Sequence, residues 1–553
     1  MPPHGHANVL THAADEVQAP RQEWVVGLAL SVLTAAYLAA TVRWNQAPTE
    51  DAAMLLRYAE HVAQGHGFVW NIGDPPLDGA TDFLFVVAVA AVARLGTSVE
   101  TAARVLGAAS HIVTVFLVYF VPRRLFRASP VLCVPIALFV AAGPAKLYIA
   151  SAFGTTFFGV WVALLWTAAL VAMERRSQLA DGVLPVLACL LGMARPEGAI
   201  LGVAVMMAVA ASRGRQAVRT CARFALWFGV LGGAYFLARW RYFGHPLPNP
   251  FYVKGGGHLY WSSLAAAGGN AVRLAGPLLT LMPLGFASGV GMRRLLLLAW
   301  PVAVFTGAWL LLSNEMNYAM RFQYAVLPLI AIAAPGLAAD ADQAWRGRIW
   351  PLLAPRWRVA LTASAAVAVA LMFMLQHRTY APAPNDSRRE AGILLAAYRD
   401  RGYTMAVSEA GLLPFYSGWR AIDTWGLNDE AIARTGRLTE EYLERSRPAL
   451  IMFHAYSSPI MPLQRAPERW DAMVLVLRDF AEARGYRLAA SFGVKPDDTH
   501  TFYVRPDLPD ADRIVDAIRA DAVLLCGNGG AVTRLRASRA LAVHRLLHGA
   551  CTP

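Results

Sequence analysis

Long apolar segments alternate with short polar segments between residues 24 and 376. The first apolar segment, residues 24–42, is long enough to cross a bilayer as a helix and ends at Arg43 and Trp44. Several later segments are too short for a full crossing and predict half-spans. The pattern predicts a polytopic α-helical membrane protein with about 10–12 hydrophobic segments. The later segments are residues 82–97, 104–121, 130–150, 157–173, 183–194, 198–212, 224–241, 274–291, 295–312, 322–339 and 359–376.

Clusters of arginine predict the orientation of these segments, because basic residues gather on the cytoplasmic side of membrane proteins. Counting segments between the clusters places three loops outside, around Arg195, at residues 242–272 and at residues 313–321. Residues 1–23 are polar, lack the pattern of a signal peptide and are expected to form a cytoplasmic tail. The clusters are Arg175 with Arg176, residues 213–223, Arg293 with Arg294, and residues 346–358.

One cluster conflicts with this orientation. If residues 82–97 and 104–121 both cross fully and the first loop, residues 43–81, is outside, the arginines at 123–127 lie outside as well. Either one of the two segments does not cross, or the positive-inside rule fails at this loop. We expect the first loop to be outside because of the chemistry of its residues.

The character of the chain changes after residue 376. A mixture of strand-like runs and helical stretches of this length predicts a small α/β domain at residues 377–553. The last apolar segment would export this domain to the periplasm, and residues 24–376 would form the transmembrane domain. The strand-like runs are Thr404–Val407, Leu450–Phe453 and Thr501–Val504, and one helical stretch is residues 467–484.

Composition supports a membrane protein over a nucleic-acid-binding protein. The 553 residues are 56% hydrophobic and only 16% charged, which is a low charge content for a soluble protein. The net charge of +13 comes from arginines between apolar segments, with no basic face interleaved with aromatic residues. We therefore expect no nucleic-acid partner. Cys526 and Cys551 lie in the polar C-terminal part, where a disulfide and two free thiols both remain open.

The first loop contains the first candidate catalytic residues. Met54, Leu55, Tyr58 and Val62 are spaced as one face of a helix that Thr49 can cap. This places Glu50 and Asp51 in the first turn, where the helix dipole favours ionised carboxylates. Paired acids beside a membrane suit a general base, a nucleophile or a metal ligand. The alternative is a helix start that merely favours acids.

The motifs of the first loop resemble those of GT-C glycosyltransferases related to the actinobacterial arabinofuranosyltransferases of cell-wall synthesis. An acidic pair is followed by an Arg-Tyr-Ala helix, two glycine turns and an acid-Gly segment before the next span. Three positions depart from the family pattern: Glu50 replaces an aspartate, Ile72 a proline and Ala80 an aromatic residue. The matching motifs are Glu50-Asp51, Arg57-Tyr58-Ala59, Gly65-His66-Gly67, Asn71-Ile72-Gly73 and Asp78-Gly79-Ala80-Thr81.

Later loops extend the resemblance in the same order. Ser313 and Asn314 replace two glycines of the family, and Gly154 stands where relatives carry a glutamate. From the residues alone, Arg195 with Glu197 could be a structural pair, Lys254 a contact to lipid headgroups, and Glu315 with Arg321 a weak salt bridge. The matching motifs are Ala152-Phe153-Gly154-Thr155, Arg195-Pro196-Glu197-Gly198, Arg241-Tyr242-Phe243-Gly244, Pro248-Asn249-Pro250-Phe251-Tyr252-Val253-Lys254, and Glu315 with Arg321.

The C-terminal part continues the resemblance with three short motifs, which read as strand, glycine turn and strand. Asp423 and Trp425 could belong to a carbohydrate platform, because aromatic faces stack on sugars; the alternative is that they are core or turn residues. The motifs are Glu409-Ala410-Gly411, Pro414-Phe415-Tyr416-Ser417-Gly418 and Ile422-Asp423-Thr424-Trp425-Gly426-Leu427.

The resemblance implies an inner-membrane GT-C glycosyltransferase with its site on the periplasmic face. The donor would be a polyprenyl-phosphate sugar, with arabinofuranose first, and the acceptor a periplasmic glycan or glycoprotein. Asp51 and Glu50 would be catalytic, and the carboxylate would act as base if the reaction inverts or as nucleophile if it retains. The resemblance assigns the donor phosphate to Lys254, Arg321, Arg195 and Arg57, and acceptor or supporting roles to Asp78, Glu197, Asn249, Tyr252, Glu315, Asp423 and Trp425.

Several alternatives stay open at this point. No cofactor is required, although a divalent metal beside Glu50 and Asp51 would be compatible with two carboxylates. A mannose or another hexose as donor sugar, and lipid A or a pilin as acceptor, are also compatible with the sequence. A flippase or transporter of lipid-linked intermediates would show charged residues at the midplane and often an internal repeat, and no repeat is visible. A non-catalytic membrane scaffold on the same fold is the third alternative.

Overall fold

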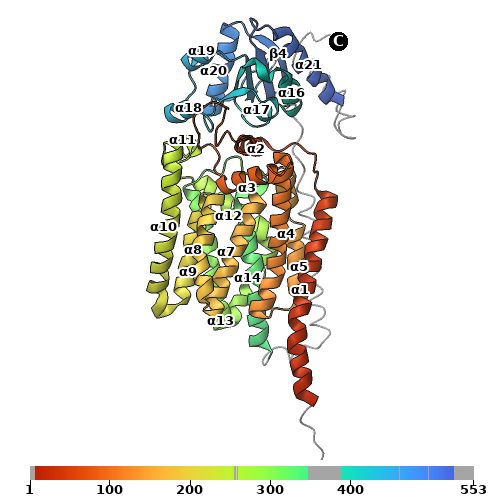
Figure 1. The fold of residues 1–553 in the computed structure, drawn as a ribbon, viewed down its shortest axis with the longest axis vertical. Helices are drawn as coiled ribbons and strands as arrows, with labels where there is room; N and C mark the ends of the chain where they lie inside the picture. The colour runs from red at the N-terminus through yellow and green to blue at the C-terminus, as the bar shows by residue number, and fades with distance from the viewer. Residues whose placement is uncertain are drawn as a thin grey trace, which may run out of the picture.

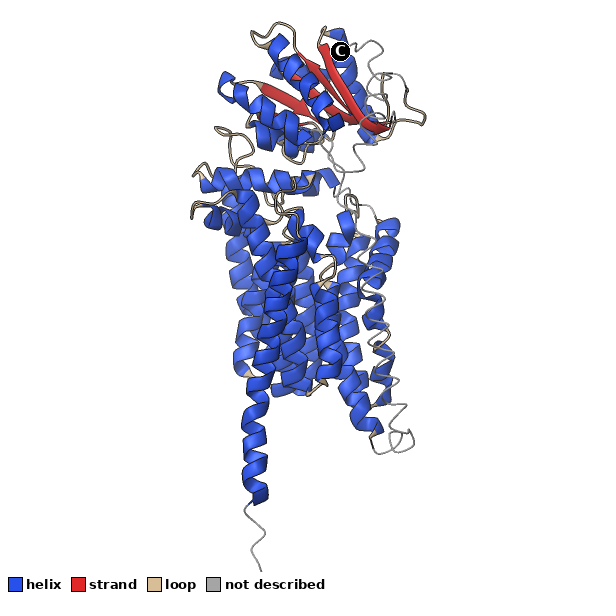
Figure 2. Ribbon diagram, turned by 90° about the vertical axis from the view of Figure 1, so that its right-hand side faces the viewer, coloured by secondary structure: helices blue, strands red, loops and turns tan. Residues whose placement is uncertain are grey.

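The computed structural model describes residues 7–527 apart from 255–256, 258, 347–387, 460 and 496. It consists of a long helical bundle and an α/β domain at one end of it (Figures 1 and 2). We call the end of the bundle that faces this domain the domain end. The predicted span at 359–376 and Cys551 lie outside the described residues, so the disulfide with Cys526 stays a prediction.

The bundle is built from helices that run between its two ends (Figure 1). Six helical stretches in the described residues are long and apolar enough to cross a membrane: Arg21–Thr41, Val99–Phe126, Pro130–Ala150, Thr155–Arg175, Gly214–Phe243 and Gly289–Leu310. The helices of the bundle are α1 (Ala7–Thr41), α4 (Val99–Phe126), α5 (Pro130–Ala141), α6 (Ala145–Ala150), α7 (Thr155–Arg175), α8 (Gln178–Ala194), α9 (Glu197–Ser212), α10 (Ala217–Phe243), α12 (Trp261–Leu279), α13 (Gly289–Gly307) and α14 (Val326–Trp345).

Burial within the bundle separates its centre from its lipid-facing rim. Helix α7 is largely buried, and Trp166 at its middle is among the largest fully buried side chains. Helix α10 buries only Phe224 and Phe243 and exposes large apolar residues such as Trp227 and Leu237. An exposed apolar surface of this extent needs an apolar solvent, because water would make it unstable. The bundle is therefore a polytopic membrane domain.

Helix α3 (Phe83–Ala93) resolves the conflict over the arginines at 123–127. Its 11 residues reach only about 16 Å at 1.5 Å per residue, which is about half of a bilayer core. It lies at the domain end beside α2 (Figure 1), and α4 then carries the chain to the opposite end. There Arg123 pairs with Glu23 of α1 at 3.3 Å. The first of the two segments therefore does not cross, and the arginines at 123–127 lie at the end of the bundle opposite the α/β domain.

Helix α2 (Glu50–Ala63) is packed between the bundle and the α/β domain (Figure 1). The predicted helix is present, and its burial extends beyond the face of Tyr58 to Leu56 and His61. The reason is that α3 packs on α2 from the bundle and α17 (Leu412–Ser417) packs on it from the α/β domain. Thr49 is the N-cap residue and Glu50 and Asp51 lie in the first turn, as expected, but the Thr49 hydroxyl makes no capping hydrogen bond.

The α/β domain contains a five-stranded sheet of order β2-β1-β3-β5-β4. Strands β1 and β2 and strands β1 and β3 are parallel, whereas β5 is antiparallel to both β3 and β4. The strands are β1 (Thr404–Val407), β2 (Arg420–Asp423), β3 (Leu450–Ala455), β4 (Arg487–Lys495) and β5 (Asp498–Val504). The helices are α16 (Arg388–Leu395), α17 (Leu412–Ser417), α18 (Glu430–Thr435), α19 (Glu440–Ser446), α20 (Arg469–Ala483) and α21 (Ala511–Gly527).

The three predicted strands are present, and β3 and β5 extend beyond the predicted runs. Between β1 and β2 the chain forms helix α17 where the sequence indicated only a glycine turn. Alternate residues of β3 pack into two different hydrophobic cores. Met452 joins the core that continues towards the bundle, and Phe453 joins the core under α20. One face of the sheet is therefore turned towards α16 and α17, the part of the domain that contacts α2.

Candidate functional site at the domain end of the bundle

Asp51 lies in the first turn of α2 and forms an ion pair with Arg321. Arg321 belongs to a short 3-10 turn, Tyr318–Gln323, that precedes α14. The Asp51 side chain is 26% exposed, whereas that of Arg321 is 8% exposed. The Arg321 side chain is thus buried, and the Asp51 carboxylate is the more accessible partner of the ion pair.

Arg195 forms a second set of ion pairs beside this one. It lies in the turn between α8 and α9, with its Nε 2.6 Å from Glu197 and its Nη1 3.7 Å from Asp82. Asp51, Asp82, Arg195, Glu197 and Arg321 together are called the Asp51 cluster below. They come from four separate segments of the chain. Asp51 is the most exposed of the three carboxylates, since Asp82 and Glu197 are only 7% and 8% exposed.

Burial and charge act in opposite directions on the pKa values of this cluster. Burial raises the pKa of Asp82, although Arg195 lowers it. Burial also lowers the pKa of Arg321, against the attraction of Asp51. For Arg195 the nearby carboxylates outweigh burial and raise its pKa. Both arginines remain cations, because a guanidinium does not lose its proton in proteins.

Aromatic rings support both guanidinium groups. The Cζ atom of Arg321 lies 3.9 Å from the ring centre of Phe153 and 4.9 Å from that of Phe322. The Cζ atom of Arg195 lies 5.2 Å from the same Phe322 ring. Rings at these distances attract a cation and exclude water from one side of it. The two arginines are therefore held in place before any ligand arrives.

Gly154 shows where the family's glutamate would stand. A Cβ atom at this position would lie 2.9 Å from the Phe85 ring and 3.1 Å from the Asp82 carboxylate. The place of the missing acid is thus next to Asp82, which faces Arg195 instead. Sequence reasoning missed Asp82, although an acid directly before the apolar run of α3 was a visible signal.

Several buried polar atoms around Asp51 have no hydrogen-bond partner among the described residues. Such atoms usually bind water or a ligand, because leaving them unpaired is costly. The backbone is also strained here, with φ angles of 60° at Ala152 and 61° at Met320. The unpaired atoms are Thr49 Oγ1, Ser151 Oγ, Thr155 Oγ1, Tyr318 Oη and Arg321 Nε.

Glu50 points away from Asp51 and into the α/β domain. Its carboxylate lies 3.1 Å from Arg388 and accepts hydrogen bonds from the backbone of Gly411 and Leu412. Successive residues of a helix project about 100° apart, so the two acids cannot share one ligand easily. Burial raises the pKa of Glu50 to about 7, helped by Glu409 and opposed by Arg388. The structure therefore separates the pair that the sequence presented together.

Arg57 is placed as a link between the first loop and the α/β domain, away from the donor-phosphate role implied by the resemblance. Its guanidinium donates to the backbone oxygens of Trp70 at 2.9 Å, Trp419 at 2.8 Å and Pro414, and to the Asn71 side chain at 3.2 Å. Burial lowers its pKa to about 10. With its donors occupied by protein oxygens, it has little capacity left for a phosphate.

Asp78 and Asn249 form a similar link. The Asp78 carboxylate pairs with Arg239 of α10, and its backbone oxygen accepts from Asn249 at 2.8 Å. The Asn249 amide donates to the backbone oxygen of Gly426 at 3.0 Å. Helix α11 (Asn249–Lys254) therefore joins the bundle to the α/β domain.

Three further residues of the sequence prediction, Tyr252 and Lys254 of α11 and the nearby loop residue Glu315, make no described contact with the Asp51 cluster. Tyr252 stacks under Arg434 of α18, 3.9 Å from its Cζ. Lys254 follows on the same short helix, and the described contacts do not join it to Asp51 or Arg321. Glu315 is exposed, and Arg321 pairs with Asp51 instead of with it.

Asp423 is a turn residue in the structure. Its two oxygens accept hydrogen bonds from the backbone of Trp425, Gly426 and Asn428 and from the Asn428 amide. Burial raises its pKa to about 6, against these donors. Trp425 packs on Trp470, with ring centres 5.2 Å apart, and lines a cavity of about 200 Å³.

A larger cavity of about 460 Å³ lies where the first loop meets the α/β domain. Asp74 and Arg420, paired at 2.6 Å, are part of its lining, as is Tyr442 of α19. Its position between the loop and the sheet edge at β2 makes it a candidate place for a polar molecule.

Comparisons with known proteins address the fold. A family model described as a domain of unknown function (DUF8728) matches residues 376–505. None of the curated proteins matches the sequence. The crystal structure of ArnT from Cupriavidus metallidurans bound to undecaprenyl phosphate superposes with a TM-score of 0.56 at 14% identity, covering 88% of this chain and 98% of that one. The apo structure of the same protein gives a TM-score of 0.55.

The chain has the GT-C fold. A superposition over nearly the whole of both chains, at an identity this low, establishes the architecture and nothing about the reaction. The expected fold class, a polytopic helical membrane protein with a C-terminal α/β domain, is confirmed. The cryo-EM structure of the arabinofuranosyltransferase AftD from Mycobacteria also matches, with a TM-score of 0.48 at 14% identity over 88% of this chain and 40% of that one.

Proposed function

We propose that this protein is a glycosyltransferase that moves a sugar from a polyprenyl-phosphate donor to an acceptor outside the membrane. The observation that carries the proposal is the Asp51 cluster at the domain end of the GT-C bundle. There an accessible carboxylate is held by a buried arginine whose Nε has no partner among the described residues. The solved structure of ArnT, which has this fold, contains undecaprenyl phosphate, and this supports a lipid-linked donor.

The two arginines provide the binding site for the donor phosphate. Arg321 offers its Nε, which no described residue binds, and Arg195 adds a second buried cation on the shared Phe322 ring. Arginine binds phosphate oxygens with two parallel hydrogen bonds. Because the donor is confined to the bilayer plane, its reacting end reaches the cluster at the membrane surface with little further loss of freedom.

Asp51 is the catalytic carboxylate in this proposal. In an inverting reaction it takes the proton of the acceptor hydroxyl while that oxygen bonds to the anomeric carbon. The bond from this carbon to the phosphate oxygen breaks, and the polyprenyl phosphate leaves with the electron pair. Arg321 stabilises the charge that develops on the leaving group. In a retaining reaction Asp51 would instead attack the anomeric carbon itself.

Arabinofuranose as the sugar, and a periplasmic glycan or glycoprotein as the acceptor, form the finer part of the proposal. They rest on the ordered motifs shared with the arabinofuranosyltransferases, including Arg57-Tyr58-Ala59 and Arg195-Pro196-Glu197-Gly198. The arginine clusters at the end of the bundle opposite the α/β domain support a periplasmic position for the site. The inner membrane of a bacterium is the matching location.

The test is transfer by the purified full-length protein reconstituted in liposomes. Synthetic polyprenyl-phosphoryl arabinofuranose and a polyprenyl-phosphoryl hexose are offered with a panel of acceptors, and products are identified by mass spectrometry. We expect transfer by the wild type and a loss of about 100-fold or more in Asp51→Asn. Glu441→Gln, which changes an exposed acid of α19, serves as the control with unchanged activity.

The outcomes separate the parts of the proposal. Transfer of the hexose alone would overturn arabinofuranose and leave the enzyme class standing. Full activity in a correctly folded Asp51→Asn variant would overturn the role of Asp51. Movement of labelled donor lipid across the bilayer without any glycosylated product would overturn the transferase in favour of a flippase.

A further inference from the structure

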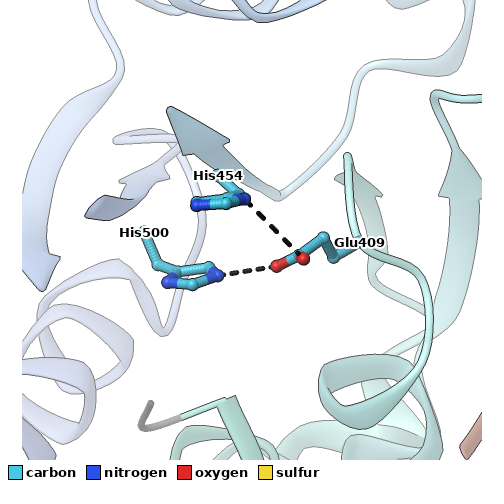
Figure 3. A group of neighbouring side chains, drawn as sticks. All are labelled: Glu409, His454 and His500. Carbon is cyan, nitrogen blue, oxygen red and sulfur yellow. Dashed lines mark hydrogen bonds and ion pairs between the residues drawn. The ribbon is translucent and has the colours of Figure 1, made fainter. Parts of the chain in front are cut away.

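A second polar cluster lies in the α/β domain, away from the Asp51 cluster. It consists of Glu409, His454 and His500, shown in Figure 3. His454 is on β3 and His500 is directly opposite it on the antiparallel strand β5. The parallel pairing of β1 with β3 places Val407 opposite Met452, and Glu409 follows two residues later at the level of His454. The sheet therefore brings three residues from distant parts of the chain to one level.

The side chains of these residues face one another on the same side of the sheet (Figure 3). One ligand atom from each residue can be chosen so that all three atoms lie within 4.8 Å of one another. His500 Nε2 is 2.6 Å from one Glu409 oxygen, and His454 Nδ1 is 3.8 Å from the other. The two imidazole rings are stacked, with centres 4.7 Å apart. A separation of this kind leaves room for one ion between the donor atoms.

The outer nitrogen of His454 has a partner of its own. Its Nε2 lies 2.8 Å from the Asp498 carboxylate, and its backbone N–H donates to Ser408 Oγ at 2.9 Å. A carboxylate that accepts the Nε2 proton leaves Nδ1 as the lone-pair nitrogen, turned towards Glu409. Histidines that bind metals usually have such a carboxylate or carbonyl behind them, which orients the ring and raises its basicity.

The charge around the three residues suits a divalent cation. Glu409, Glu50 and Asp498 are acids, and Arg388 is the base that contacts both Glu409 and Glu50. Two neutral imidazoles and one carboxylate are the ligand set of many catalytic zinc sites, which keep a fourth position open for water.

We propose that Glu409, His454 and His500 bind a single Zn²⁺ or a similar transition-metal ion. The ion joins the end of β1 to β3 and β5, with water at its fourth position. The Glu409 oxygen next to His500 also contacts Arg388, and Arg388 holds Glu50 at the start of α2. The metal thereby positions the turn of α2 that carries Asp51. This role differs from the metal beside Glu50 and Asp51 that the sequence left open, because the three ligands belong to the α/β domain.

Metal binding is measured on the untagged full-length protein in detergent. The protein is stripped with a chelator, equilibrated with buffered Zn²⁺ and analysed for bound zinc per protein, and its affinity is determined against a fluorescent zinc indicator. Binding of Co²⁺ is followed by its absorption spectrum, which reports the ligand geometry. We expect one equivalent of zinc and a low-symmetry Co²⁺ spectrum in the wild type.

Matched variants identify the ligands. His454→Ala and His500→Gln each should lose the bound equivalent, and the glutamine keeps a hydrogen-bond donor for Glu409. His245→Ala is the control, because His245 pairs with Glu430 at 2.5 Å and the described part of the chain places no third metal ligand beside them. It should bind zinc as the wild type does. Asp498→Asn should weaken binding by about 10-fold to 100-fold, since it removes only the group behind His454.

Two results would overturn the site. One is a wild type that retains no zinc after equilibration. The other is a zinc content and affinity that stay unchanged in His500→Gln while circular dichroism shows the variant to be folded. Neither result depends on transferase activity, so failure of the metal site and failure of the proposed reaction are distinguishable.

Discussion

The Asp51 cluster and the group of Glu409, His454 and His500, called the Glu409 cluster, differ in the kind of nitrogen side chain that faces their carboxylates. In the first, two arginines on aromatic rings face three carboxylates, and the arginines cannot give up their protons. In the second, two histidines face one carboxylate, and neutral imidazole has a lone pair to donate. Permanent cations suit a phosphate ligand, whereas lone pairs suit a metal ion.

The two clusters also differ in how they are assembled. The Asp51 cluster gathers turns between helices at one end of the bundle, and strained φ angles at Ala152 and Met320 accompany it. The Glu409 cluster follows directly from the register of β1, β3 and β5. Arg388 and Glu50 connect them, because Glu50 is the neighbour of Asp51 on α2. The comparison therefore separates the cluster that we propose to react from the cluster that we propose to support it.

The largest expected effect comes from replacing each of the two acids of α2 with its amide. Asp51→Asn should reduce the rate of transfer by about 10²-fold to 10⁴-fold, because it removes the accessible carboxylate. Glu50→Gln keeps one oxygen that accepts from the backbone N–H of Gly411 or Leu412, and because Glu50 faces away from the site it should retain most of the rate. Initial rates with saturating acceptor measure both. Equal losses in the two variants would contradict the separate roles of the two acids.

Arg57→Ala tests whether this arginine is structural. The change leaves the backbone oxygens of Trp70 and Trp419 without a donor in a buried place, which should cost about 3 kcal/mol or more. We expect a lower melting temperature in detergent, with the donor KM of the surviving folded protein unchanged. Arg434→Ala, which affects a half-exposed arginine on α18, is the control with a small effect. A raised donor KM at unchanged stability would restore Arg57 to the phosphate site.

Removal of metal should destabilise the α/β domain more than the bundle. At a free zinc concentration of about 100 times the dissociation constant, binding contributes about 2.7 kcal/mol. Hydrogen exchange followed by mass spectrometry should show faster exchange in β3 and β5 after chelation, while α7 stays unchanged. The His500→Gln variant should show the fast pattern with or without zinc. Uniform protection in all states would contradict the supporting role of the metal.

The smallest expected effect concerns Asp423. Burial raises its pKa to about 6 from an ordinary 3.8, so the folded state holds the proton that the unfolded state has lost. The unfolding free energy should therefore fall as the pH rises through about 6, by about 1 kcal/mol between pH 5 and pH 7. Comparing melting temperatures of the wild type and Asp423→Asn at the two pH values checks this. The pH-dependent difference between them should vanish if Asp423 is not the titrating group.

Sequence reasoning reached the Asp51 cluster only in part. Asp51, Arg195, Glu197 and Arg321 were visible as polar residues at the ends of apolar runs, but their pairing was not. Asp82 was missed because a single acid before a helix is common. His454 and His500 were missed because they are 46 residues apart, and a strand register cannot be deduced from such a spacing.

Most of the long helices and several strands of this protein follow from its sequence. Apolar length set the helices of the bundle, arginine clusters predicted their direction, and runs of strand-forming residues marked β1, β3 and β5. Tertiary structure alone decided which polar residues meet. The docking of the α/β domain on α2 turned Glu50 and Arg57 into structural links and left Asp51 with Arg321. Helical and strand periodicity are local properties of the sequence. The partner of a buried charge is instead decided by the packing of segments that are far apart in the sequence.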